Sequence, residues 1–227
     1  PNDEELDCNS TDISLGKKAA DLDSILADAI KHFIVKRDDL KTVIAGYPWF
    51  LDWGRDTLIC VRGIIAAGMT EDVRKILLQF GSFEENGTLP NMIHGGDATN
   101  RDTSDAPLWY FVACDDLMKA EGNTSLLNEV AGNRTIKEIL ISLAENIISG
   151  TPNGIKVDEH SGLVFSPSHF TWMDTNYPAG TPRKGYPVEI QALWYEALTL
   201  LAECTGDSKW SNLASKVKNS FKQYFWN

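Results

Sequence analysis

The sequence predicts an all-α fold. In most of the regular segments, apolar residues recur at three- and four-residue steps, which is the spacing of one face of a helix. Short turns connect some of these segments, and long loops rich in aromatic residues connect the others. If the helices run up and down, alternate connections emerge at the same end. We therefore expect the loops at residues 46–56, 89–105 and 165–187 to meet there.

The N-terminal part is predicted to contain a lead-in, a helix, a short strand and a second helix. Residues 1–14 are polar and acidic without periodicity, so we expect a disordered or linker segment. Apolar residues recur at helical steps over residues 15–33, and residues 41–45 form a β-like run. The next helix covers about residues 56–67, with Gly68 as its C-cap.

The middle of the chain is predicted to hold two further helices. The third helix begins with Thr70 as its cap and stops near the turn at residues 86–87. A polar, glycine-rich loop follows over residues 91–103. The fourth helix begins at residue 104 or 105 and ends at Gly122.

The C-terminal half is predicted to be mainly helical, with one long irregular region. A helix covers about residues 135–149, and residues 155–170 read as short extended pieces separated by turns. Helices over residues 188–203 and 208–224 form an αα-hairpin joined at residues 205–207. Periodicity thus indicates about seven helices.

Composition limits the classes of function. The chain has 227 residues, enough for one large domain or two small ones, and its 43% hydrophobic content is ample for a core. Its formal net charge of -11 has the wrong sign for nucleic acid or an anionic membrane surface. The longest apolar runs are far shorter than the roughly 20 residues of a bilayer span. The N-terminus lacks the features of a signal peptide, so we expect a cytoplasmic protein without a membrane segment.

The cysteines show no metal-binding or disulfide spacing. Three of the four lie within apolar helical patterns, so all are expected to be buried thiols. The four are Cys8, Cys60, Cys114 and Cys204. We expect the chain to need no metal and no cofactor.

One loop combines aromatic rings with a pair of opposite charges. Aromatic rings can cover the apolar face of a sugar, while an adjacent donor and acceptor can bind its vicinal hydroxyls. The alternative is that the rings are ordinary core residues and the charges form an ion pair at a helix start. The residues concerned are Tyr47, Trp49, Phe50 and Trp53, followed by Arg55 and Asp56.

Several further segments accompany this loop in a fixed order. Together they resemble the amylo-α-1,6-glucosidase domain of glycogen debranching enzymes, glycoside hydrolase family 133. The resemblance begins near Ala29 and reaches the last residue. Its segments are Tyr47-Pro-Trp-Phe-Leu-Asp-Trp-Gly-Arg-Asp-Thr57, Leu89-Pro-Asn91, Ser104-Asp-Ala106 with Trp109, Thr171-Trp-Met-Asp174, and Thr181-Pro-Arg-Lys-Gly-Tyr-Pro-Val-Glu-Ile190 with Leu193-Trp-Tyr195.

The resemblance implies an (α/α)6 toroid of the glucoamylase-like type, with the active site in a funnel at one end. Glucoamylases and trehalases are similar in fold. About seven of the twelve helices are expected in this chain. Residues 15–227 would then be the N-terminal part of the glucosidase domain, truncated before its C-terminal helices.

The resemblance also implies roles for single residues. Arg55 and Asp56 match the pair that holds the terminal glucose, a task suited to a guanidinium beside a carboxylate. Trp49 and Trp53 would form stacking walls. Asp174 matches the general acid, although an aspartate in such a loop is more often the cap of a turn.

A general acid must keep its proton until the glycosidic oxygen departs. An aspartic acid has an ordinary pKa of about 3.9, which burial or a nearby carboxylate raises. We expect Trp172 to supply aromatic cover, and Asp56, Asp105 and Glu189 to lie near Asp174. Asp105 and Glu189 could form hydrogen bonds with substrate, or equally be helix N-terminal carboxylates.

Other residues of the matched segments are expected to contact substrate. These are Asn91, Trp109 and Lys184. Lys184 and its neighbour Arg183 could bind sugar hydroxyls or balance the acidic residues, and the sequence leaves both possibilities open.

The general base that the resemblance implies is a glutamate between two late helices, and it is absent from this chain. An incomplete ring would expose apolar edges, which soluble monomers rarely tolerate. We therefore expect a fragment of a longer polypeptide. Alone, it would be inactive and could form a homodimer through these edges.

Three functions follow from this reading. The first is hydrolysis, with inversion, of α-1,6-linked glucose stubs on glycogen or maltodextrin. The second is a non-catalytic module that binds such α-glucans. The third is another exo-glucosidase of the same fold, glucoamylase-like or trehalase-like. The remainder of the parent polypeptide is the other expected partner.

Overall fold

The computed structural model describes residues 21–175 and 180–226. Helices dominate this part of the chain, and every sheet in it has only two strands. The predicted all-α class is therefore confirmed at this coarse level. The expected lead-in over residues 1–14 lies outside the described residues. In the described ranges, no helix combines the length and apolar character needed to cross a membrane.

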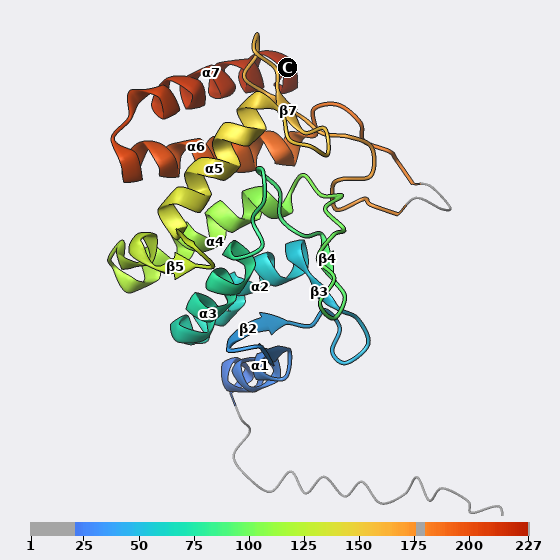
Figure 1. The fold of residues 1–227 in the computed structure, drawn as a ribbon, viewed down its shortest axis with the longest axis vertical. Coiled ribbons are helices and arrows are strands. Elements are labelled where there is room, and N and C mark those ends of the chain that lie inside the picture. Colours follow the sequence, from blue (N-terminus) through green and yellow to red (C-terminus); the bar gives the residue numbers. More distant parts are fainter. Residues whose placement is uncertain (1–20, 176–179, 227) are drawn as a thin grey trace, which may run out of the picture.

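Seven α-helices occur in the described residues, as periodicity predicts (Figure 1). The part of the first predicted helix over residues 15–20 lies outside the description. The helices are α1 (Leu22–Lys31), α2 (Gly54–Ala66), α3 (Thr70–Gly81), α4 (Ala106–Glu121), α5 (Ile136–Ser149), α6 (Val188–Thr205) and α7 (Ser208–Phe225).

Four antiparallel strand pairs connect or brace these helices in the described residues. The β-like run predicted at residues 41–45 is confirmed as strand β2 (Leu40–Val43). Its partner, β1 (Ile34–Arg37), was not predicted, because its four residues show neither the alternating pattern of a strand nor the spacing of a helix. The pairs are β1 (Ile34–Arg37) with β2 (Leu40–Val43), β3 (Asp52–Trp53) with β4 (Met92–Ile93), β5 (Val130–Ala131) with β6 (Arg134–Thr135), and β7 (Lys156–Val157) with β8 (Val164–Phe165).

Gly68 ends α2 as predicted. Its φ of 77° is left-handed, and its N–H donates to the Ile65 carbonyl over 2.8 Å. The following N–H, of Met69, donates to the Ile64 carbonyl over 3.1 Å. This is the Schellman arrangement, which satisfies carbonyls that the helix leaves free.

The predicted bounds of α3 are wrong at both ends. Thr70 is the first helical residue, Met69 occupies the cap position, and no side chain caps the helix. The helix stops at Gly81 rather than near residues 86–87. Just beyond this end, the Phe83 and Glu84 N–H groups donate to the Phe80 and Gly81 carbonyls three residues back, and the Phe83 carbonyl accepts from Arg101 over 2.9 Å.

The remaining helix ends follow local sequence signals. Gly122 ends α4 in a left-handed conformation, and Gly206 does the same for α6. At the start of α5, Thr135 Oγ1 accepts the Glu138 N–H and Glu138 Oε2 accepts the Thr135 N–H over 2.8 Å, which is a capping box.

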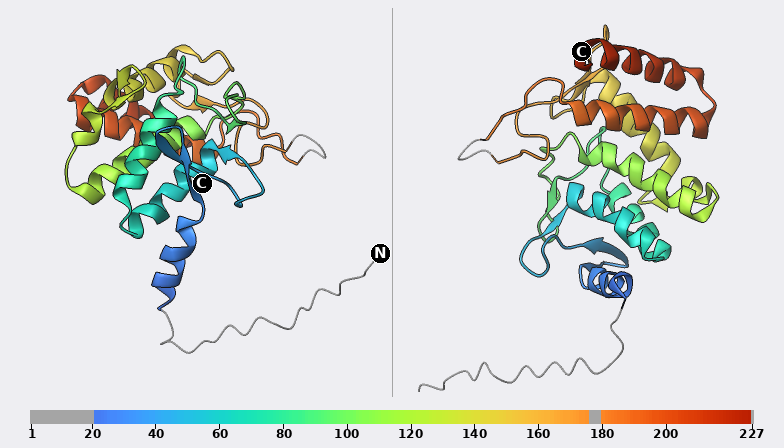
Figure 2. Two further views of the ribbon diagram at one scale, coloured as in Figure 1. Left: turned by 60° about the horizontal axis from the view of Figure 1, so that its bottom comes forward. Right: turned by 180° about the vertical axis from the view of Figure 1, so that it is seen from behind.

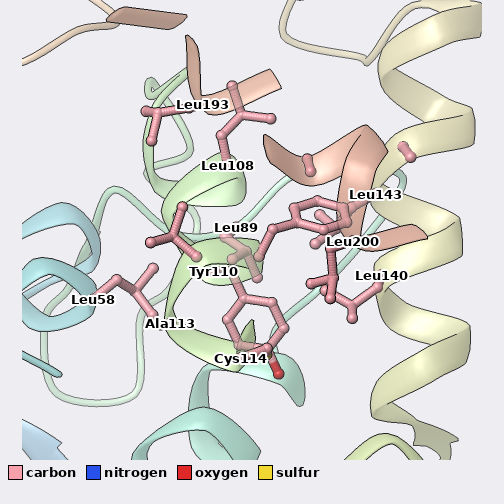
Figure 3. Packing of buried hydrophobic residues seen from close by; sticks show 14 of the residues in the cluster. Leu58, Leu89, Leu108, Tyr110, Ala113, Cys114, Leu140, Leu143, Leu193 and Leu200 are labelled. Carbon is pink, nitrogen blue, oxygen red and sulfur yellow. The ribbon is translucent and has the colours of Figure 1, made fainter. Parts of the chain in front are cut away.

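The core forms where α4 lies against α2, α3 and α6, with α5 and α7 packed on α6. Figure 3 shows Tyr110 of α4 between Leu58 of α2 and Leu140 of α5. The Tyr110 side chain is fully buried, and its hydroxyl donates to the Leu77 carbonyl over 2.9 Å. Burying a large apolar side chain contributes about 1.5–3 kcal/mol, so this contiguous core carries most of the stability.

The long loops gather at one end of the helices, which Figures 1 and 2 show from opposite sides. We call residues 46–53, 89–105, 165–175 and 180–187 the rim. Hydrogen bonds tie its loops together: Ser104 N–H donates to the Phe170 carbonyl over 2.7 Å, and Ser166 pairs with Gly185. β3 and β4 join the first two loops.

Two expectations about burial have different outcomes. Cys114 is buried, and burial raises the pKa of its thiol, but Cys60 and Cys204 are only half-buried because the helix faces that carry them are partly open. Cys8 lies outside the described residues.

The α1 helix buries none of its residues and exposes Leu22, Ile25 and Leu26. Dimerisation through such an apolar edge stays a prediction.

Candidate functional site

Arg55 is the centre of the site that the rim forms. Its Nη2 donates to Asp174 Oδ2 over 3.1 Å, and its Nη1 donates to Asp105 Oδ2 over 3.3 Å. Nη1 also donates to the Thr171 carbonyl over 3.1 Å. One guanidinium thus connects the start of α2 with the start of α4 and with the loop that contains Asp174.

A close backbone approach holds Arg55 in this position. The preceding residue, Gly54, opens α2, and a β-carbon there would lie 2.4 Å from the Pro90 carbonyl oxygen. The Gly54 N–H donates to the Asn91 carbonyl over 2.9 Å, and the Asn91 N–H donates to the Asn100 carbonyl over 2.8 Å. The second rim loop therefore lies directly against the first turn of α2.

Asp105 faces Arg55 and does not cap α4 with its side chain. Its carboxylate is buried, and the Thr103 hydroxyl donates to it over 2.7 Å. Burial raises the pKa of Asp105, while the Arg55 charge and the Thr103 hydroxyl oppose that rise. For Arg55, burial is outweighed by Asp105 and Asp174, so its pKa is raised and it keeps its charge. Asp105 thus stands at the N-cap position of α4, but its carboxylate pairs with Arg55 and forms no capping hydrogen bond.

Asp174 is half-buried, and its contact with Arg55 is an ion pair. Trp172, the expected aromatic cover, leaves 58% of its surface exposed. The guanidinium carbon of Arg183 lies 5.9 Å from the centre of the Trp172 ring. The Asp174 carboxylate therefore has a cation as its neighbour where the sequence suggested an aromatic pocket.

Arg183 and Glu189 form a bidentate ion pair at the edge of the rim. Arg183 Nη2 donates to Glu189 Oε2 over 2.6 Å, and Nη1 donates to Oε1. Glu189 lies in the first turn of α6 but does not cap it. Of the two roles left open for Arg183, the structure shows the balancing of an acid. Lys184 is exposed.

The predicted aromatic residues differ in exposure. Trp49 is 83% exposed on the first rim loop, while Trp53 is half-buried. Trp109 is also half-buried and packs against the core. The alternative that the loop aromatics are core residues therefore fails for Trp49, and also for Tyr47 and Phe50, which are 48% and 61% exposed.

Asp56 does not share a cavity with the Arg55 network. It lines a separate, open cavity of about 990 Å³ beside α1, together with Phe33 and Cys60. Adjacent helical residues point about 100° apart, so the two members of the Arg55–Asp56 pair face different surroundings. The expected proximity of Asp56 to Asp174 is not among the contacts of the described residues.

A polar cavity of about 330 Å³ lies beside Asp174. Predicted residues Trp53 and Asn91 line it, together with several that the sequence analysis missed. Their only sequence signal is their position in loops next to recognised segments. The missed residues are Asn100, Asp102, Ser168, His169, Phe170 and Thr175.

A second missed feature anchors the aromatic loop. Arg37 of β1 forms an ion pair with Asp52 of β3, with 3.0 Å between Nη1 and Oδ2, and also donates to the Gly95 carbonyl. Burial raises the pKa of Asp52, and the Arg37 charge opposes that rise. Arg37 thus links the β1–β2 hairpin to the first two rim loops.

Comparisons with known proteins agree with these observations. The profile of a family described as amylo-alpha-1,6-glucosidase matches residues 28–227. Glycogen debranching enzyme of Saccharomyces cerevisiae is 23% identical over 229 aligned residues, covering 75% of this chain. The chain spans about 15% of the length of that curated relative.

Proposed function

The chain belongs to the amylo-alpha-1,6-glucosidase family, and on that premise we propose that it supplies the acid half of an inverting glycosidase site. The substrate is an α-1,6-linked glucose stub on glycogen or maltodextrin. The helices form part of an (α/α)6 toroid, and the rim is the substrate entrance. The general base comes from residues outside these 227.

One observation carries this proposal: Arg55 binds Asp174 across 119 positions of sequence, beside a polar cavity. A planar donor next to a carboxyl group can bind sugar hydroxyls while the carboxyl acts on the adjacent glycosidic oxygen. Family membership supports the reaction class, and the convergence of two rim loops on Arg55 supports the location.

Asp174 is the proposed general acid. In the free protein its carboxylate is ion-paired with Arg55. When the terminal glucose binds, its hydroxyls take over the Arg55 donor, and the Asp174 carboxylate takes up a proton from solvent water. It then donates that proton to the departing glycosidic oxygen as the sugar ring gains oxocarbenium character.

Asp105 is proposed to position Arg55 and not to touch substrate. It is buried behind the guanidinium and is itself held by the Thr103 hydroxyl. This arrangement leaves Arg55 charged and restricts its rotation, so one face of the guanidinium remains directed at Asp174.

Inversion requires water to attack the anomeric carbon from the side opposite the leaving group. The second carboxylate that activates this water lies about 6.5–9.5 Å from the acid in inverting enzymes. We propose that a later segment of the parent polypeptide places that carboxylate opposite Asp174. The 227-residue chain alone would then bind glucan without hydrolysing it.

The other predicted binding residues have unequal support. Trp53 and Asn91 line the cavity beside Asp174 and are proposed sugar contacts. The exposed Trp49 and Trp172 are proposed stacking surfaces. Binding roles for Asp56, Trp109, Lys184 and Glu189 stay predictions.

The test measures glucose released from a singly branched dextrin by the longest natural polypeptide that contains this sequence. Loss of a general acid costs about 10²- to 10⁴-fold, so Asp174→Asn should lower the rate by about a thousandfold while glucan binding is retained. Asp116→Asn is the matched control, because Asp116 pairs with Arg62 on the surface. An unchanged rate for Asp174→Asn would remove Asp174 from the acid role.

The same assay separates the alternatives. A wild-type polypeptide that binds branched dextrin without releasing glucose would be a binding module. Faster hydrolysis of maltose or trehalose than of branched dextrin would indicate another exo-glucosidase.

A further inference from the structure

His169 lies in the rim loop that leads to Asp174, and its backbone is left-handed, with a φ of 64°. Side chains generally avoid this conformation, although histidine tolerates it better than most. Neighbouring loops impose it: the His169 N–H donates to the Pro182 carbonyl over 2.9 Å, and the Phe170 carbonyl accepts from Ser104 over 2.7 Å. These contacts fix where the imidazole lies.

The imidazole has free hydrogen-bonding capacity. Its Nδ1 is enclosed and has no hydrogen-bond partner in the described part of the chain. None of the hydrogen bonds between described residues uses its Nε2. The enclosed Nδ1 cannot itself reach a ligand, but the unused Nε2 is not enclosed and can form a hydrogen bond with one.

The cavity that His169 lines indicates the class of ligand. Asp102 and Asp174 contribute carboxylates, which disfavour an anion. The described residues contain no group of three side chains suited to a metal ion. The amides of Asn91 and Asn100 and the ring of Trp53 complete the wall. A neutral polyhydroxyl ligand fits this mixture, because its hydroxyls can donate to carboxylates and accept from amide and imidazole N–H groups.

We propose that His169 is a substrate-contacting residue, whose imidazole forms a hydrogen bond with a hydroxyl of the glucosyl unit in the cavity beside Asp174. The inference rests on the proposed function and adds a contact to it. The loop geometry explains the strained backbone: the neighbouring segments hold the ring in the cavity wall before substrate arrives.

The first test needs no variant. Isomaltose is added to the 227-residue chain, and the imidazole nitrogens are followed by long-range ¹H–¹⁵N NMR. We expect the chemical shifts of the His169 ring nitrogens to change with isomaltose concentration. The midpoint of this change should equal the midpoint of the change in tryptophan fluorescence. The exposed histidines His32 and His160, which lie outside the rim, serve as internal references and should stay still.

The second test compares dissociation constants for isomaltose. His169→Gly removes the imidazole and suits the left-handed backbone, so the melting temperature should not fall. Binding should weaken about fivefold, the factor that corresponds to one neutral hydrogen bond. His169→Asn should recover part of the loss, because asparagine tolerates the same backbone and retains a polar amide. His160→Ala, at an exposed histidine, is the control.

The outcomes distinguish this inference from the proposed function. The inference is overturned if isomaltose binds while the His169 signals stay still and the dissociation constant of His169→Gly equals that of the wild type. That result leaves the proposed function intact. Failure of the wild-type chain to bind isomaltose or a branched dextrin overturns both. If His169→Gly does not fold, the NMR titration of the wild-type chain decides.

Discussion

The two ends of the helices are built differently. At the end opposite the rim, α2 ends in a Schellman turn at Gly68, α4 and α6 end in left-handed glycines, and α5 begins with a capping box at Thr135. At the rim, His169 and Arg183 are left-handed without being glycine. The rim also exposes large aromatic side chains, namely Tyr47, Trp49, Phe50, Trp172 and Tyr186.

This difference separates stability from function. At the opposite end, local hydrogen bonds satisfy the free backbone groups of the helix ends, so these groups need no ligand as a partner. The rim holds unpaired polar atoms, exposed rings and a shared guanidinium, which are features that a bound substrate could complete. Substitutions at the two ends should therefore affect different measurements.

The largest effect is expected for Arg55→Ala, which should harm both stability and binding. It leaves the buried Asp105 carboxylate without its cation, and breaking a buried pair in this way costs about 3 kcal/mol. Urea denaturation measures the loss. Adding Asp105→Asn should restore part of the stability but not isomaltose binding. If Arg55→Ala alone is as stable to urea as the wild type, the buried ion pair does not contribute to the stability of the rim.

A smaller effect, confined to binding, is expected for Trp49→Ala. The side chain is 83% exposed, so its removal should leave the melting temperature unchanged. Loss of one stacking surface should weaken binding of branched dextrin by about tenfold, measured by calorimetry. The matched control is Trp226→Ala, because Trp226 is 77% exposed but lies outside the rim. Equal losses of affinity in both variants would show that the dextrin does not bind preferentially at the rim.

The smallest effect concerns the opposite end and should be confined to stability. Hydrogen bonds from Thr135 lower the pKa of Glu138. A carboxylate with a lowered folded pKa stabilises the fold above its unfolded pKa, and this contribution is lost as pH falls through the folded value. Glu138→Gln should therefore melt below the wild type at pH 7 and equal it in acid. Binding of isomaltose should not change. A difference in melting temperature between variant and wild type that widens on acidification would contradict a stabilising role for the ionised Glu138.

Most helices could be predicted because their signals are local. The capping box at Thr135 and the glycine at the end of α2 lie within a few residues of the backbone groups they satisfy. The end of α3 could not be predicted this way, because Arg101 reaches the Phe83 carbonyl from 18 positions away. The β1 strand was missed for the same reason: its partner and the Arg37–Asp52 pair specify it, and neither is visible in its own four residues.

The candidate site was predictable in part. Arg55, Asp105 and Asp174 stand in the recognised segments, and the structure brings these three together. Asp56 follows Arg55 directly, yet it faces another cavity, because chain neighbours on a helix point in different directions. His169 carries no motif of its own, and only its backbone angle and its unpaired ring nitrogen single it out.

The sequence by itself determined the helical class and most helix ends, because periodicity and capping act over a few residues. Tertiary structure alone decided which charges meet. Arg55 pairs with carboxylates 50 and 119 positions away, and its burial between them sets its electrostatics. Such contacts depend on how loops from separate helices converge in space, and no local pattern encodes that convergence.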